Sequence, residues 1–278
     1  MEKQIAIETL HLFPVLDRML VELLSSLTPE HWHAQTVARL WKVKDVAAHL
    51  LDGNLRGLST SRDRYFGEHP SDIGSYDQLV AYLNDLNLSW TNAARRVSPH
   101  VLISLLESTG KEYSAHLQSL DPFANAIFSV AWAGQKTSTN WFHIAREYTE
   151  KFLHQQQIRD AVGKPGIMTR ELYYPFLDTL MYALPFTFKN VEAEVGTTVS
   201  VKVTGEGGGQ WNIVRDEREW KAAKEVTRTP NALVTVRANM AWKLFSKSRR
   251  PADVGAELEI TGDDRLGSQA LEMVAVMA

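Results

Sequence analysis

The stretch "REYTEKFLHQQQ", which runs from Arg146 to Gln157, decides how the N-terminal half of this chain is interpreted. It places Glu150 and His154 four residues apart, and His143 and Glu147 repeat this spacing just upstream in the opposite order. At about 100° per residue, all four side chains fall within a sector of roughly 60° on a helical wheel, and nearby aromatic residues fall opposite. The pattern therefore predicts a helix with a glutamate–histidine face and an aromatic face.

The glutamate–histidine face allows two interpretations. An amphipathic helix buries its aromatic side and exposes the other, and glutamate and histidine are common on a solvated face. Alternatively, a carboxylate and an imidazole four residues apart can both reach one ion. A catalytic divalent metal site commonly has three protein ligands and an open position. The metal interpretation therefore requires a third ligand from another helix.

A third ligand is available in "WKVKDVAAHLLDG", Trp41 to Gly53, which contains His49. The apolar stripe of this predicted helix puts His49 at the edge of the buried face, where it can point into a groove between helices. Asp45 and Asp52 lie within one turn of His49, so either can orient its imidazole. The alternative is a histidine at a helix edge with a carboxylate neighbour.

The composition is that of an ordinary globular protein. The 278 residues favour two domains, and the net charge of −3 gives no long-range attraction to nucleic acid or an anionic membrane. Without cysteine the chain has no disulfide, thiolate ligand or cysteine nucleophile. We find neither a signal-peptide pattern nor an apolar run of about 20 residues, and we expect a cytoplasmic protein with no membrane partner.

The first half of the chain reads as helical. Apolar residues at helical spacing, with proline, serine and glycine at the boundaries, predict helices over about 5–27, 42–64, 76–97, 98–120 and 140–162. The sequence Gly163-Lys164-Pro165-Gly166 is a strong stop signal. Short connections between the helices suggest an antiparallel bundle.

The pattern changes after Gly166. A further helical segment is interrupted by Pro175 and Pro185, and alternating stretches then predict strands in "TVSVKV", "QWNIV", "ALVTVRA" and "AELEIT". Short helices are expected in "NMAWKLFSK" and after "GDD". We therefore predict a two-domain α+β protein, with a helical bundle over 1–164 and a small α+β domain with a mostly antiparallel sheet over 165–278.

The two quoted helices, "WKVKDVAAHLLDGN" and "REYTEKFLHQQQIRDAVG", resemble those of the DinB-like superfamily. More narrowly, the chain resembles the mycothiol-dependent maleylpyruvate isomerase family, and its C-terminal part is similar to sterol carrier protein folds. The resemblance implies a four-helix bundle that holds a divalent metal at His49, Glu150 and His154. His143 and Glu147 do not match ligand positions, and we interpret them as groove-lining residues or neighbours of the ligands.

The resemblance also implies a chemistry. Zinc or nickel suits two imidazoles and a carboxylate. In the family, a low-molecular-weight thiol such as mycothiol adds to an activated double bond, which gives isomerisation of an unsaturated diacid or transfer of the thiol to an electrophile. The predicted partner is thus a small-molecule substrate, and the chain is expected to be a monomer or homodimer.

A dianionic substrate requires cations. Arg237, at the end of the "ALVTVRA" strand, is the arginine we expect to meet a carboxylate, with an exposed strand-end arginine as the alternative. Arg146 and Arg159 are expected to form salt bridges on the surface. Two other functions stay open: a non-catalytic DinB-like binding or stress-response protein, and a hydrolase that uses water at the same metal.

Overall fold

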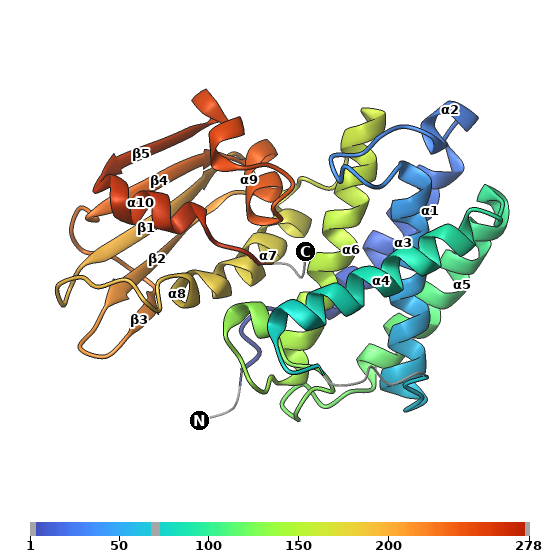
Figure 1. The fold of residues 1–278 in the computed structure, drawn as a ribbon, viewed down its shortest axis with the longest axis horizontal. Coiled ribbons are helices and arrows are strands. Elements are labelled where there is room, and N and C mark those ends of the chain that lie inside the picture. The colour runs from blue at the N-terminus through green and yellow to red at the C-terminus, as the bar shows by residue number, and fades with distance from the viewer. Residues whose placement is uncertain (1–3, 68–72, 276–278) are drawn as a thin grey trace. The chain divides into compact units, whose positions relative to one another are not determined.

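The computed structural model describes residues 4–67 and 73–275 of the chain, and they divide into two compact units (Figure 1). The first unit comprises 4–67, 73–127 and 139–166, and the second comprises 128–138 and 167–275. Within these described ranges, no helix combines the length and the apolar character needed to cross a membrane.

Four helices of the first unit form a bundle. They are α1 (Phe13–Ser25), α3 (Val43–Gly57), α5 (Pro99–Gln118) and α6 (Asn140–Val162). Helices α1 and α3 each pack against both α5 and α6, which closes a ring around a shared core (Figure 1). Helix α4 (Tyr76–Ala94) packs against α3, and the short helix α2 (Pro29–Trp32) joins α1 to α3. A π-helical turn, Leu58–Arg62, continues α3.

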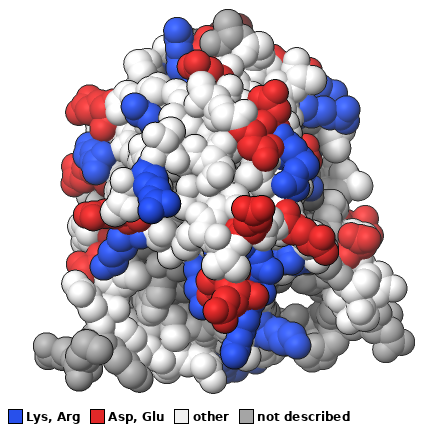
Figure 2. All heavy atoms as spheres, turned by 90° about the vertical axis from the view of Figure 1, so that its left-hand side faces the viewer, with Lys and Arg blue, Asp and Glu red and all other residues white. Residues whose placement is uncertain are grey.

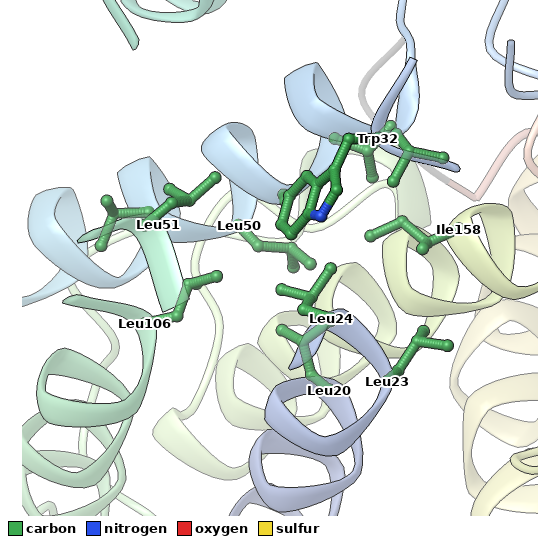
Figure 3. Close-up of a cluster of buried hydrophobic side chains, with 12 residues drawn as sticks. Leu20, Leu23, Leu24, Trp32, Leu50, Leu51, Leu106 and Ile158 are labelled. Carbon is green, nitrogen blue, oxygen red and sulfur yellow. The ribbon is translucent and has the colours of Figure 1, made fainter. Parts of the chain in front are cut away.

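Leucine side chains from three of the bundle helices meet around Trp32 of α2 to form a hydrophobic cluster (Figure 3). Trp32 is 5% exposed, and Leu50 of α3 and Ile158 of α6 pack into the same cluster. Burying side chains of this size stabilises the fold by about 1.5–3 kcal/mol each. The cluster therefore holds α3 and α6 next to each other, and these are the helices that carry His49, Glu150 and His154.

Local sequence signals set most of the helix boundaries. The Ser75 and Ser98 side chains accept hydrogen bonds from the backbone N–H groups of Gln78 and Val101, as predicted for caps. Helix α6 ends at Gly163, whose φ of 64° is left-handed. The first predicted helix is shorter than expected, because α1 begins only at Phe13, with proline in its first turn.

A polar network crosses the bundle. Lys151 Nζ on α6 lies 2.6 Å from Asp17 Oδ1 on α1 and 2.9 Å from Asn54 Oδ1 on α3. Asn54 Nδ2 donates to Thr109 Oγ1 on α5 at 3.1 Å. The network thus takes one side chain from each of the four bundle helices and fixes their relative register.

The second unit is built on a five-stranded sheet with the strand order β3-β2-β1-β4-β5. The strands are β1 (Thr198–Thr204), β2 (Gly209–Arg215), β3 (Trp220–Ala223), β4 (Ala232–Arg237) and β5 (Leu258–Gly262). Only the β1–β4 pair is parallel among these strands. The predicted fold class, a helical bundle and an α+β part with a mostly antiparallel sheet, is therefore confirmed.

Helices α7 (Arg170–Leu180), α8 (Leu184–Thr187), α9 (Ala238–Phe245) and α10 (Asp264–Leu271) complete the second unit. Helix α10 packs on β1, β4 and β5 (Figure 1). The predicted interruption at Pro175 is wrong, since α7 continues through it. The carbonyl that proline leaves without a partner belongs to the exposed residue Glu171 and can face solvent.

The face drawn in Figure 2 carries a mixed charge pattern. Basic and acidic side chains alternate there, and neither sign forms a large continuous patch. This distribution agrees with the small net charge of −3.

Candidate metal site

Helix α3 places His49 at the margin of the bundle core. The side chain is half-buried, whereas its neighbours Val46 and Leu50 are buried. Asp45 Oδ2 accepts a hydrogen bond from the Lys42 backbone N–H at 3.0 Å, and Asp52 Oδ2 lies 2.9 Å from Arg56 Nε. Asp45 thus caps the start of α3 and Asp52 faces Arg56, and no hydrogen bond joins either carboxylate to His49 among the described residues, so their role in orienting His49 stays a prediction.

Helix α6 brings Glu150 and His154 together. They lie one turn apart on the same face, and Glu150 Oε2 is 3.3 Å from His154 Nε2. His154 is only 8% exposed, while Glu150 is partly buried. The helix thus presents a carboxylate and an imidazole as a pair within the bundle.

The structure brings His49 to this pair. One ligand atom from each of His49, Glu150 and His154 can be chosen so that all three lie within 4.8 Å of one another. The two imidazole rings are 4.5 Å apart between centroids at 74°, and Trp41 lies against both, at 4.7 Å from His49 and 5.8 Å from His154. His49 and the Glu150–His154 pair, about a hundred residues apart in sequence, therefore share one small space beside an indole ring.

The protonation states in this space favour cation binding. Burial lowers the pKa of His49 well below its usual value, and a positive charge on His154 would lower it further. Burial alone would raise the pKa of Glu150, but the hydrogen bond and charge of His154 outweigh it and lower this pKa to about 2. At neutral pH His49 is therefore a neutral donor and Glu150 an anionic one.

Two further observations show that these residues fit a divalent metal. Nδ1 of His49 is buried and has no hydrogen-bond partner among the described residues, so this polar atom is left without a partner that a metal or another ligand could supply. Nδ1 of His154 lies 2.9 Å from Gln157 Oε1. When Nδ1 carries a proton and donates to Gln157, Nε2 is the nitrogen that can exchange its hydrogen bond to Glu150 for a metal ion.

The solvated-face interpretation of α6 is wrong for its histidines, since His143 is 3% exposed and His154 8%. His143 Nδ1 accepts a hydrogen bond from Arg146 Nη2 at 3.2 Å, and its Nε2 lies 3.8 Å from Glu147 Oε1. Arg146 also forms a close ion pair with Glu147. The residues one turn before Glu150 therefore form a polar cluster of their own.

Three predicted arginines have different surroundings. Arg237 belongs to the second unit, is exposed, and lies 3.4 Å from Glu257 through Nε. Arg159 is 8% exposed and donates to the carbonyl oxygens of Met19, Lys164 and Pro165, so its predicted place in a surface salt bridge is wrong. Arg146 does form an ion pair, but its side chain is only 19% exposed.

Sequence reasoning missed two contributors to this region. Gln157 follows His154 by three residues, and this spacing was a usable signal for a residue that orients the imidazole. Tyr113 of α5 lies beside Glu147, and no spacing pattern connects residues on two different helices.

The chain thus combines a helical bundle, in which two histidines and a glutamate converge, with an α+β unit. This arrangement is that of a two-unit protein with a candidate metal centre in its bundle. The chain belongs to the family of the mycothiol maleylpyruvate isomerase N-terminal domain, whose model matches residues 14–159. The predicted family resemblance is therefore confirmed.

Solved structures with a similar fold include two crystal structures. One is of the mycothiol-dependent maleylpyruvate isomerase, with 9% identity and a TM-score of 0.53. The other is of a histidine-to-alanine mutant of that enzyme, with 10% identity and a TM-score of 0.54. Each similarity covers 91% of this chain and 91% of the other. At such low identity the likeness shows the fold alone, and no curated protein matches the chain significantly.

Proposed function

We propose that this protein is a divalent-metal-dependent enzyme that uses a low-molecular-weight thiol, as an isomerase or thiol transferase of the maleylpyruvate isomerase type. The observation that carries the proposal is the convergence of His49, Glu150 and His154 within 4.8 Å. The family membership and the names of the structurally similar enzymes support the thiol, with mycothiol as the leading choice.

The proposed ligands are the two imidazoles and the Glu150 carboxylate. Zinc and nickel both accept this donor set. A bound divalent ion with a free coordination position lowers the pKa of a thiol or water and polarises a carbonyl group. The chain supplies a neutral His49, an anionic Glu150, and the Trp41 ring that packs against both imidazoles.

The proposed substrate is a small electrophile, with an unsaturated diacid as the first choice. For the second unit we retain the proposal that Arg237 meets a substrate carboxylate, since an exposed guanidinium on a strand end can offer a bidentate contact. We also propose 1–164 and 165–278 as the functional division of the chain. Arg237→Gln should then raise KM for a diacid and leave the metal content unchanged.

The test of the proposed function combines metal analysis with a thiol panel. Purified protein should contain close to one divalent ion per chain, and His49→Ala should lose it. An electrophilic test substrate should react only when a thiol is supplied. Activity without any thiol indicates a hydrolase, and bound metal without activity across the panel indicates a binding protein. Full metal content and activity in His49→Ala would refute the ligand assignment.

A further inference from the structure

A second cluster of buried polar groups lies one helical turn before the proposed ligand Glu150. Its members on α6 are His143, Arg146 and Glu147, and Tyr113 joins them from α5. Arg146 lies four residues before Glu150, so the two side chains share one face of the helix. Burial opposes the charge on Arg146, but the carboxylates of Glu147 and then Glu150 outweigh it and raise the pKa of Arg146.

One edge of the Arg146 guanidinium is fixed. Its Nη2 forms the close ion pair with Glu147 Oε1 and donates to His143 Nδ1 at 3.2 Å. Tyr113 packs beside Glu147 and can lie there because Gly57 has no side chain: a Cβ at Gly57 would lie 2.5 Å from Tyr113 Cε2. Packing around Glu147 therefore holds the guanidinium in one orientation.

Two other nitrogens of the guanidinium are available. Within the described part of the chain, Nε and Nη1 of Arg146 make no hydrogen bond, and neither is among the fully enclosed polar atoms that lack a partner. The side chain is 19% exposed. Each of these nitrogens can donate a charge-assisted hydrogen bond to a carboxylate oxygen. Arg146 thus offers N–H donors of fixed direction next to Glu150.

The charge balance of the region favours an anion. Glu147 offsets Arg146 in a close ion pair, and Glu150 is paired with the His154 imidazole. A divalent ion at the proposed ligands turns this excess of one negative charge into an excess of one positive charge. A partly buried site with a net positive charge attracts one anionic group.

From this geometry we propose that Arg146 binds a carboxylate of the small molecule that reacts at the metal site. The inference rests on the proposed function and assigns a specificity-determining residue to the first unit itself. The carboxylate can belong to the diacid substrate or to the thiol, and the same guanidinium contact serves either source.

The test uses full-length protein loaded with Co²⁺, whose visible spectrum reports ligands that bind at or beside the metal. Maleate, mercaptoacetate and the uncharged 2-mercaptoethanol are titrated into wild-type protein and the Arg146→Gln variant. We expect the variant to keep its cobalt and to bind at least one carboxylate probe roughly 10- to 100-fold more weakly, the loss typical of a charge-assisted hydrogen bond. Affinity for 2-mercaptoethanol should not change.

The pattern of loss identifies the source of the carboxylate. A loss for maleate assigns Arg146 to the substrate, and a loss for mercaptoacetate alone assigns it to the thiol. Arg18→Gln is the matched control, because Arg18 is exposed on α1 and pairs there with the exposed Glu22. Wild-type affinity for both carboxylates in Arg146→Gln overturns the proposal, as does failure of wild-type protein to bind either.

A second variant covers the case in which Arg146→Gln fails to fold or loses cobalt. Arg146→Lys keeps the charge but removes the Nε–H and Nη1–H donors, and it should bind the carboxylate probe less tightly than wild type with full cobalt content. Unchanged affinity in this variant also overturns the proposal. If wild-type protein takes up no divalent metal, the proposed function fails together with this inference. If wild-type protein takes up metal and the Arg146 variants bind the carboxylate probes as tightly as wild type, only the role of Arg146 is refuted.

Discussion

At the scale of single residues, the orientation of His154 depends on Gln157. The glutamine oxygen lies 2.9 Å from Nδ1 and favours the tautomer in which Nε2 is free to bind a metal. Gln157→Leu should therefore weaken zinc binding roughly 10- to 100-fold, measured by competition with a chromophoric chelator.

Gln156→Leu is the matched control. Gln156 is also buried, and its Oε1 has no hydrogen-bond partner among the described residues, so we expect wild-type zinc affinity and equal or higher stability. Equal affinities in the two variants would show that Gln157 does not orient the ligand.

His143 gives the folded chain a dependence on pH. Burial, followed by the positive charge of Arg146, lowers the pKa of His143 from 6.5 to about 4. As pH falls through 6.5 the unfolded chain binds this proton and the folded chain does not. The free energy of unfolding should therefore fall by about 3 kcal/mol between pH 6.5 and 4 from this residue alone.

Urea denaturation at several pH values tests the predicted fall in the free energy of unfolding. His143→Gln should give a shallower fall in the unfolding free energy over that interval, whatever its stability at pH 7. His100→Gln, at an exposed position on α5, should keep the wild-type slope. Identical slopes in wild type and His143→Gln would exclude His143 as the source.

At the scale of elements, the close contact of α3 with Tyr113 of α5 makes Gly57 irreplaceable. Alanine favours a helix over glycine by about 1 kcal/mol, but its Cβ at this position would lie 2.5 Å from the Tyr113 ring. Overpacking typically costs about 1–3 kcal/mol, so Gly57→Ala should lower the free energy of unfolding despite the better helix former.

Gly53→Ala separates the two effects. Gly53 lies in the same helix, and a Cβ there meets nothing within 4 Å, so this variant should be neutral or more stable in chemical denaturation. Destabilisation of the same size in both variants would contradict the role assigned to Tyr113.

The elements that the sequence predicted correctly carry their signals locally. Ser75, Ser98 and Gly163 mark helix boundaries through contacts within one turn, and alternation marks β1 and β4. Strand β3 was missed because Trp220–Ala223 has only four residues, too few for alternation to be visible.

The site was predictable only in part, because only some of its contacts lie within one helix. Spacing within α6 pairs Glu150 with His154, the helix-edge position offered His49 as a third ligand, and the family resemblance favoured it. The burial of the polar face of α6 could not be predicted, because it depends on which helices pack against it. The cluster around Arg146 depends on Tyr113 of another helix and on the absence of a side chain at Gly57.

At the scale of the whole molecule, a metal held between α3 and α6 should stabilise the first unit. Binding to the folded state alone adds about 2.7 kcal/mol when free zinc exceeds its Kd a hundredfold. In calorimetry, excess zinc should raise the Tm of the metal-binding transition and a chelator should reverse the rise.

Glu150→Gln should remove most of this effect, because it takes away the anionic ligand while keeping the size of the side chain. Lys151→Gln has no proposed ligand role and should be less stable, yet still respond to zinc. A zinc-dependent rise of equal size in Glu150→Gln would place the ion elsewhere on the chain.

The lysine-centred network of Lys151, Asp17, Asn54 and Thr109 has a mechanical consequence. Leucine side chains alone would let one helix slide along its neighbours and still find apolar partners. Here a slide of one turn would leave the Lys151 ammonium group and the Asp17 carboxylate in the interior without partners, at a cost of several kcal/mol. Loop insertions between these helices should accordingly be absorbed by bulging of the added residues and not by slippage of the bundle.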